Sequence, residues 1–246
     1  MIKRLLILGG TGEASALVRS LPLGLDATLS LAGRTATPKA EPVPTRIGGF
    51  GGVDGLADWM EGNRITHVVD ATHPFAARMS ANAAQACART GTPLLAIRRP
   101  AWDPVPGDRW ECVSDMAGAV AALGAAPRRV FLTVGRQEVG VFAGAPQHDY
   151  LVRSIEPVDL AVPRLTAVFA RGPFAEADEA AFLRDQGIDV VVSKNSGGAA
   201  TYGKIAAARG AGLPVVMVAR PPKPDVPSVA DAAGALAWLT ALQGVR

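Results

Sequence analysis

Short apolar runs alternate with amphipathic stretches along almost the entire chain. The runs have the length of strands, and the stretches between them repeat apolar residues at helical spacing. Strands that alternate with helices are typical of a parallel sheet covered by helices on both faces. In the first part of the chain this pattern predicts strands at Lys3–Leu8, Ala27–Ala32, Thr45–Ile47, Ile65–Asp70 and Pro93–Arg98, and helices at Glu13–Arg19, Val53–Glu61 and Phe75–Arg89.

The second part of the chain repeats this order of elements. Two series of the same kind indicate an α/β fold of two similar doubly wound, Rossmann-like parallel-sheet domains. Because such sheets bind ligands at the carboxyl ends of their strands, we expect the two domains to face a central cleft. The second series comprises strands at Arg129–Val134, Tyr150–Ser154, Ala167–Ala170, Asp189–Ser193 and Pro214–Ala219, and helices at Gln137–Phe142, Phe174–Asp185, Ala199–Arg209 and Val229–Leu242.

The two halves also end in similar letters. Arg98-Arg99-Pro100 precedes a proline-containing stretch and the segment 113–123, and Ala219-Arg220-Pro221 precedes a similar stretch and the segment 229–239. Chance is the alternative in so alanine-rich a chain, but the matching order of elements favours duplication. We therefore expect one domain at residues 1–126 and another at 127–246. The long linkers can carry a terminal strand or helix across to the other domain.

Composition narrows the class of protein. The chain has 246 residues, of which 49% are hydrophobic and 19% charged, as in well-packed globular proteins. Its net charge of +3 is too small to indicate a nucleic-acid partner. The apolar runs are too short for a membrane span or a signal peptide, and Cys87 and Cys112 lack metal-ligand spacing. These features predict a cytoplasmic protein without a metal site.

The first predicted strand runs into a glycine-rich turn, Gly9-Gly10-Thr11-Gly12-Glu13. Glycines here let the backbone turn tightly and approach a pyrophosphate, and the following helix supplies free N–H groups. Gly10 and Gly12 fit the first two glycines of the dinucleotide fingerprint, whereas Ser15 replaces the third. An ordinary tight turn is the alternative. The motif favours nucleotide binding by Gly9, Gly10, Thr11, Gly12 and Glu13.

Two further strand ends extend this cofactor site. Arg34 and Thr35 follow the second strand, where an arginine suits the adenosine phosphate of NADP and an acidic residue would suit NAD. Gly49 and Phe50 belong to a glycine-rich run after the third strand, which lets the backbone lie against a cofactor. A solvated surface arginine and a mobile lid are the alternatives.

The fourth strand leads into Asp70-Ala71-Thr72-His73-Pro74-Phe75. Asp70 and Thr72 can cap the next helix, whose first turn tolerates the proline. Capping does not require a histidine, so His73 is expected to point toward the nicotinamide. We take His73 and Asp70 as catalytic candidates and Thr72 as part of the cofactor site.

The second half offers cations and backbone donors at its own strand ends. Each cation alone is equally well explained as a solvated surface charge. Together with the amides at a helix start, they suit the carboxylates or phosphates of a substrate. The residues expected to bind substrate are Arg136, Arg171, Lys194, Asn195, Ser196, Gly197, Gly198, Thr201 and Lys204.

Several motifs occur together across nearly the whole chain: GGTGEA, GGFGG, DATHPFA, Thr133-Val134-Gly135-Arg136 and SKNSGG. In this combination the sequence resembles the precorrin-6A reductase family of cobalamin biosynthesis. The resemblance implies a cytoplasmic, NADPH-dependent reductase that reduces one double bond of the tetrapyrrole precorrin-6A to give precorrin-6B. It agrees with the expectations from the residues alone, namely Arg34 for the NADP phosphate and the cations of the second half for a substrate with many carboxylates.

Other functions fit parts of this pattern. The cobalt-precorrin-6A reductases of the anaerobic route are similar, and Arg34 leans toward NADPH and the metal-free substrate. A non-catalytic two-domain sensor would bind NADPH without turnover. A short-chain-type carbonyl reductase needs Tyr-x-x-x-Lys, whereas Tyr202-Gly203-Lys204 has the wrong spacing. We expect a monomer with transient contacts to neighbouring pathway enzymes, and either His73 or solvent as the proton donor.

Overall fold

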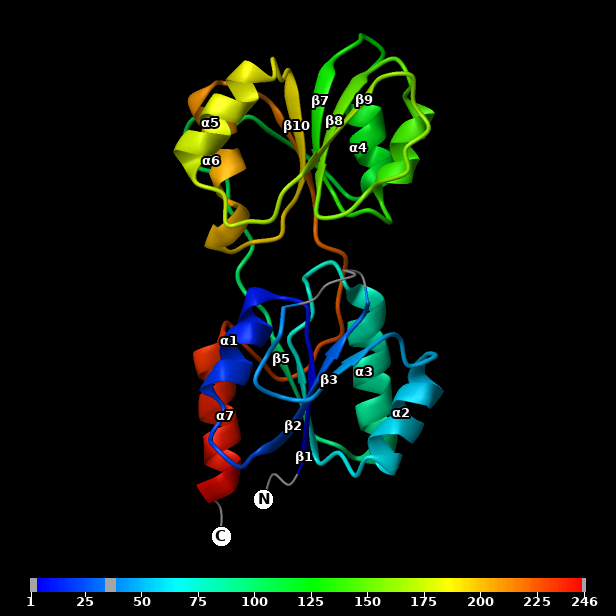
Figure 1. Cartoon of the computed structure of the whole chain (residues 1–246), viewed down its shortest axis with the longest axis vertical. Helices are drawn as coiled ribbons and strands as arrows, with labels where there is room; N and C mark the ends of the chain where they lie inside the picture. Colours follow the sequence, from blue (N-terminus) through cyan, green and yellow to red (C-terminus); the bar gives the residue numbers. More distant parts are fainter. Residues whose placement is uncertain (1–3, 34–38, 245–246) are drawn as a thin grey trace. The chain divides into compact units, whose positions relative to one another are not determined.

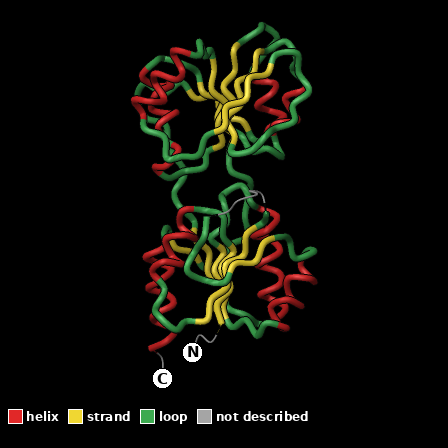
Figure 2. Tube along the Cα trace, in the orientation of Figure 1, coloured by secondary structure: helices red, strands yellow, loops and turns green. Residues whose placement is uncertain are grey.

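The computed structural model describes residues 4–33 and 39–244, and the chain divides into two compact units (Figures 1 and 2). The first unit comprises Met1–Pro100 and Pro222–Arg246, and the second comprises Ala101–Pro221. In each unit helices lie on either side of a central sheet (Figure 1). The predicted α/β architecture with two parallel sheets is confirmed.

The first unit is built on a six-stranded parallel sheet of order β12-β5-β4-β1-β2-β3. Helices α1 (Gly12–Ser20) and α7 (Ala232–Gly244) share one apolar core, and α2 (Val53–Gly62) and α3 (Ala77–Thr90) pack on another. Strands covered on both faces are expected to be apolar throughout, as the buried run from Leu5 to Leu8 is. The strands are β1 (Arg4–Leu8), β2 (Asp26–Leu31), β3 (Thr45–Ile47), β4 (His67–Asp70), β5 (Leu94–Ile97) and β12 (Ser228–Val229).

The second unit has a six-stranded parallel sheet of order β6-β11-β10-β7-β8-β9. Helices α5 (Glu176–Asp185) and α6 (Gly203–Gly210) cover one face (Figure 1), and α4 (Met116–Ala122) lies on the other beside the 3-10 helix η1 (Val139–Gly144). A second 3-10 helix, η2 (Ala199–Thr201), precedes α6. The strands are β6 (Trp110–Val113), β7 (Arg129–Thr133), β8 (Asp149–Ser154), β9 (Leu165–Phe169), β10 (Val190–Lys194) and β11 (Val215–Val218).

The two sheets have the same topology, and each takes its outermost strand on one side from the other half of the chain. After β5 the chain crosses to the second unit and adds β6 beside β11, and after β11 it returns and adds β12 beside β5. The predicted exchange of terminal elements is confirmed, and it is reciprocal. The expected division at residue 126 differs from the observed one, because the segment 101–126 carries β6 and α4 into the second unit. The expected central cleft between the domains stays a prediction.

The sequence repeat corresponds to this exchanged strand and helix. Asp115 accepts a hydrogen bond from the backbone N–H of Gly118 at 2.8 Å, and Asp231 accepts one from Gly234 at 2.9 Å. A Cβ at Gly234 would lie 2.9 Å from the Cβ of Val229, which is closer than real side chains pack. The repeated letters therefore encode a capped helix that packs closely on the strand before it.

Several predicted elements differ from the observed ones. The strand Trp110–Val113 was not predicted, because it is a half-exposed edge strand with the polar Glu111 inside it. The predicted helix at Gln137–Phe142 is the 3-10 helix η1, and Val229 belongs to a strand rather than to the last helix. No helix in the described part of the chain is long and apolar enough to cross a bilayer.

Close packing at Gly55 predicts a sharp effect of a single methyl group. An alanine Cβ at Gly55 would lie 1.8 Å from the carbonyl oxygen of Phe50, whereas one at Gly62, at the end of the same helix α2, would meet no atom within 4 Å. We expect Gly55→Ala to lower the free energy of unfolding by about 1–3 kcal/mol. Gly62→Ala should leave it unchanged or raise it by up to about 1 kcal/mol. Urea unfolding of both variants checks this, and equal effects would contradict it.

Candidate functional site

The order of strands places a topological switch point at the carboxyl ends of β1 and β4. From β1 the chain proceeds to β2 and β3 and then returns through α2 to β4, on the other side of β1. Open α/β sheets bind ligands at such a point. The loops after the two strands are joined, because Thr11 Oγ1 donates to the carbonyl oxygen of Ala71 at 2.8 Å.

The glycine-rich turn after β1 presents open backbone. Gly10 has a φ of +103°, and a Cβ at either Gly10 or Gly12 would meet no heavy atom within 4 Å. Thr11 caps helix α1 by accepting the N–H of Ala14 at 3.2 Å. Gly9 has a different function, because a Cβ there would lie 2.5 Å from Leu29 Cδ1 on β2. Gly9 therefore lets the turn pack on the sheet, and Gly10 and Gly12 leave room for an anion at the helix N-terminus.

Glu13 anchors an arginine beside this turn. Arg99, just after β5, donates from Nη1 to both carboxylate oxygens of Glu13 at 3.0 and 2.9 Å. Burial alone would raise the pKa of Glu13, but the hydrogen bonds and positive charge of Arg99 lower it below its usual value. The guanidinium of Arg99 is therefore tied through Glu13 to the first turn of α1, which follows the glycine-rich turn directly.

Asp70, the last residue of β4, is a buried anion with its partners in place. It is 1% exposed. Its Oδ1 accepts the hydroxyl of Thr72 at 2.6 Å and the N–H of the same residue at 3.1 Å. Its Oδ2 accepts Ser80 Oγ at 2.6 Å and Arg98 Nη1 at 3.0 Å. This carboxylate organises the loop after β4 and a helix packed beside it.

The charge state of Asp70 follows from these partners. Burial alone would raise the pKa of Asp70, but the hydrogen bonds from Ser80 and Thr72 and the charges of Arg98 and Lys223 lower it below its usual value. A carboxylate with these partners is well placed to position the loop after β4. The catalytic role expected for Asp70 stays a prediction.

His73 lies in the loop that Asp70 organises, and the structure defines its tautomer. Its Nδ1 accepts the backbone N–H of Phe75 at 3.2 Å, so the proton of the neutral ring is on Nε2. Lys223, from the segment that returns to the first unit before β12, donates to the carbonyl oxygen of His73 at 3.0 Å and to Thr72 Oγ1 at 3.2 Å. The loop is thereby held from both sides.

The predicted contacts on the adenosine side are only partly described. Arg34 and Thr35 lie outside the described residues. The Phe50 ring packs edge-on against Trp59. The guanidinium of Arg46 lies over the Phe50 ring, 3.8 Å from the centroid of that ring. Arg46 also donates to the carbonyl oxygens of Gly48 and Gly49 at 2.9 and 3.0 Å. These contacts make the Phe50 ring part of the packing of the turn, while Gly49 keeps open space around its Cα.

In the second unit, the turn after β10 is fixed by side chains from two crossing segments. Asn195 and the backbone of Trp102 exchange two hydrogen bonds of 2.8 Å. Arg220 donates to the carbonyl oxygens of Asn195 and Ser196 at 2.8 and 3.1 Å. Both Gly197 and Gly198 have positive φ, which only glycine adopts readily. The Asn195 side chain is thus committed to holding the turn.

Lys194 and Glu138 meet at the switch point of the second sheet. Lys194 Nζ donates to Glu138 Oε2 at 2.6 Å, and the backbone N–H of Gly135 donates to the same oxygen at 2.9 Å. The side chain of Lys194 is 12% exposed. The ammonium lies at the strand end as predicted, but paired with an internal carboxylate.

Lys204 lies at the start of α6, as predicted, but its side chain is buried. It is 5% exposed, and its Nζ donates to the carbonyl oxygen of Thr201 at 2.7 Å. Burial, helped by the charge of Arg153 and opposed by that of Glu179, lowers its pKa to about 7. The residues at the start of α6 are buried, so the ammonium of Lys204 binds the backbone of η2, and its expected contact with substrate stays a prediction.

The remaining predicted cations lie at the surface. Arg136 Nη1 donates to Glu156 at 2.9 Å, and its side chain is about half exposed. Arg171 is exposed beyond the end of β9. Both residues follow carboxyl ends of strands in the second sheet, as expected.

Sequence reasoning missed residues whose partners are distant along the chain. Arg98 and Arg99 were noted only as the start of a repeat, although each pairs with an acidic residue of the first unit. The sequence did contain one signal: an arginine precedes proline in both Arg99-Pro100 and Arg220-Pro221. Arg220 likewise binds a turn at a strand end, the one after β10. Lys223 and Glu138 carried no signal in the sequence.

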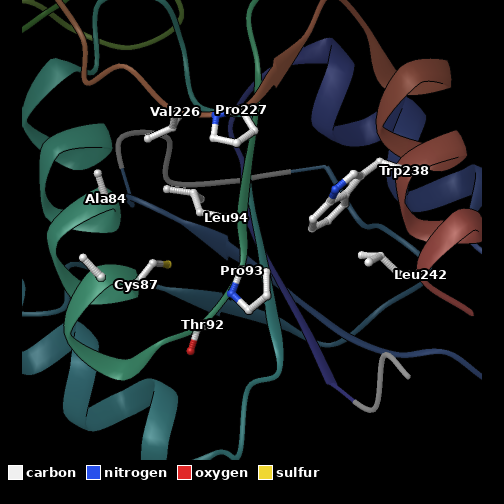
Figure 3. Close-up of a pocket in the computed structure, with 10 residues that line it drawn as sticks. Ala84, Cys87, Thr92, Pro93, Leu94, Val226, Pro227, Trp238 and Leu242 are labelled. Atoms are coloured by element: carbon white, nitrogen blue, oxygen red, sulfur yellow. The ribbon is translucent and has the colours of Figure 1, made fainter. Parts of the chain in front are cut away.

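A separate pocket of about 410 Å³ lies in the first unit, where strands β5 and β12 begin (Figure 3). Ala84 and Cys87 of α3 face Trp238 and Leu242 of α7 across Leu94, the first residue of β5. Its lining is almost entirely apolar. Burial raises the pKa of the Cys87 thiol to about 12, so the thiol stays protonated. No group of three metal-ligating side chains was found in residues 4–33 and 39–244.

Two Rossmann-like sheets, one with a glycine-rich turn at its switch point, define an α/β protein of two units, of the class in which ligands bind at such a point. Residues 4–240 match the family model described as Precorrin-6x reductase CbiJ/CobK, and the chain belongs to this family. It is 58% identical to a precorrin-6A reductase of Sinorhizobium sp, over 95% of this chain and 91% of that protein. A solved structure of CobK precorrin-6A reductase superposes with a TM-score of 0.93 at 50% identity, covering 98% of this chain and 97% of the other.

Similarity to relatives named cobalt-precorrin-6A reductase is lower. A cobalt-precorrin-6A reductase of Salmonella typhimurium is 30% identical over 88% of this chain and 87% of that protein. The sequence identity to the Sinorhizobium precorrin-6A reductase is nearly twice as high.

The buried charge of Asp70 predicts a pH-dependent contribution to stability. Because its pKa is lowered from the usual 3.8, the contribution is present above that pH and is lost as pH falls through the folded-state pKa. We expect Asp70→Asn to cost about 3 kcal/mol at pH 7, and less as the pH falls below the usual value. Asp54→Asn, which breaks the exposed pair with Arg89, should cost less than about 0.5 kcal/mol.

Urea unfolding between pH 7 and pH 3 provides the comparison. If Asp70→Asn lowers the free energy of unfolding by the same amount over this whole range, the ionised form of Asp70 contributes no more to stability than the protonated form, and the prediction is wrong.

Proposed function

We propose that the protein reduces one double bond of precorrin-6A with NADPH, giving precorrin-6B in cobalamin biosynthesis. The observation that carries this proposal is the open glycine-rich turn at the switch point of a chain that belongs to the precorrin-6x reductase family. The relatives named precorrin-6A reductase support the metal-free substrate. The cytoplasmic location, the monomeric state and the transient contacts with pathway enzymes stay predictions.

The cofactor is proposed to bind the first unit. A Cβ at Gly10 or Gly12 would meet open space, and the guanidinium of Arg99 is bound to Glu13, the residue after Gly12. The equivalent turn of the second unit, after β7, has its Gly135 N–H bonded to Glu138 instead. This contrast favours the first unit for the pyrophosphate. The choice of NADPH over NADH rests on Arg34, as the sequence suggested.

His73 is the proposed proton donor. NADPH, when bound, supplies a hydride, and reduction of a double bond then needs one proton at the other end of the conjugated system. The acid form of the ring is the imidazolium, in which both nitrogens carry a proton, so donation from Nε2 requires the ring to take up a proton from solvent and the bond from the N–H of Phe75 to Nδ1 to open. Asp70, Thr72 and Lys223 position the loop that carries this ring. Solvent is the alternative donor.

The second unit is proposed to bind the carboxylates of the macrocycle. Lys194 lies at the strand end beside the turn that Asn195 and Arg220 hold in place. Arg136 and Arg171 follow other carboxyl ends of the same sheet. Amides of the segment from Ser196 to Gly198, and Thr201, complete the proposed donors. Lys204 contributes by supporting the turn, since its ammonium is buried.

Reduction of precorrin-6A by NADPH tests the function directly, and Gly12→Val tests the place of the cofactor. We expect turnover with NADPH and much less with NADH, and faster turnover of precorrin-6A than of its cobalt complex. Gly12→Val should weaken NADPH binding by about 100-fold or more, near 3 kcal/mol, because the valine fills the space of the pyrophosphate. The control variant Gly62→Val changes the last residue of α2 and should bind NADPH normally. Normal binding by folded Gly12→Val would place the cofactor elsewhere.

A pair of lysines tests the substrate site. Lys194→Ala should raise the KM for precorrin-6A about tenfold, the scale of one charge-assisted contact, and added salt should raise it further. The Kd of NADPH should change by less than about twofold. Lys204→Met removes the buried ammonium that supports this turn, and should raise the KM less than Lys194→Ala does and without dependence on salt. If steady-state kinetics show the larger rise in KM for Lys204→Met, Lys204 contacts the substrate and Lys194 has the supporting role.

A further inference from the structure

The switch point of the second sheet is filled by a carboxylate of the protein itself. One ammonium, from Lys194, and one backbone N–H, from Gly135, converge on Glu138 Oε2 at 2.6 and 2.9 Å. A Cβ at Gly135 would lie 2.7 Å from the same oxygen, so the carboxylate occupies the space that stays open in the first unit. Convergence of a cation and an amide on one oxygen is the geometry of a carboxylate-binding site.

We propose that Lys194 and Gly135 form a binding position for a carboxylate of the substrate, and that Glu138 occupies this position until the substrate arrives. This inference rests on the proposed function, since it assigns one arm of the macrocycle to this site. The exchange replaces one carboxylate by another, so Lys194 keeps an anionic partner throughout. Glu138, whose side chain is 27% exposed, regains water when it leaves.

The local structure explains why Glu138 can leave. It lies in the loop between β7 and η1, and its backbone N–H bonds back to the carbonyl oxygen of Gly135 at 2.8 Å. The turn is therefore closed by the backbone and does not depend on the side chain. Lys194, by contrast, is fixed as the last residue of the central strand β10, and its side chain is mostly buried. The cation stays in place while its partner changes.

Binding of uroporphyrin tests this without turnover. Its ring carries acetate and propionate groups, and its fully methylated ester is the uncharged control. We expect Glu138→Gln to bind uroporphyrin about fivefold more tightly than the wild-type chain, because an internal competitor is lost. The ester should bind both proteins equally. Glu111→Gln, which removes the same charge from exposed strand β6 of the same unit, should change the affinity by less than about twofold.

A double variant locates the source of the gain. In Glu138→Gln with Lys194→Met the gain should disappear, because it depends on the released ammonium. Equal or weaker binding by Glu138→Gln, with an unchanged melting temperature, would overturn the proposal and make Glu138 a structural partner of Lys194. An equal gain in Glu111→Gln would also overturn it, by showing an effect of net charge alone. If uroporphyrin binds as expected but precorrin-6A is not reduced, the site stands and the proposed function fails.

Discussion

The buried charge of Asp70 is the constraint on which the candidate site of the first unit depends. A carboxylate with 1% exposure is tolerated only where donors and opposite charges surround it. These come from separate parts of the chain: Thr72 from the adjoining loop, Ser80 from α3, and Arg98 from the end of β5. The same groups that neutralise Asp70 thereby fix the loop that carries His73.

The exchange of terminal strands contributes to this constraint. Lys223 lies between the return of the chain to the first unit and strand β12, and it donates to Thr72 and to the carbonyl oxygen of His73. Pairing of β12 with β5 therefore both completes the sheet and brings a cation to the site. The last strand and helix are part of the machinery of the first unit, although they are encoded at the far end of the chain.

The sequence predicted the elements that are locally encoded. Apolar runs such as Leu5–Leu8 and Val190–Val192 identified the central strands, since these are buried on both faces. The short edge strands β6 and β12 have no such run, and only pairing with β11 and β5 defines them. The glycine-rich turn and the Asp70 loop were also predicted, because their residue types reflect local backbone and capping requirements. The partners of Asp70 and Glu13 were not, because Arg98, Arg99 and Lys223 lie far from them along the chain and meet them only through the tertiary fold.

Lys194 and Lys204 show why a residue type alone does not define a site. Both lysines flank the same turn, and both were predicted to bind substrate. Lys194 ends a strand at the carboxyl edge of the sheet, so its ammonium reaches the switch point and binds an anion. Lys204 lies on the inner face of α6, where burial lowers its pKa to about 7 and a charged form is costly. The position of a lysine relative to the sheet edge, and not its distance along the sequence, decides whether its charge is presented to a ligand.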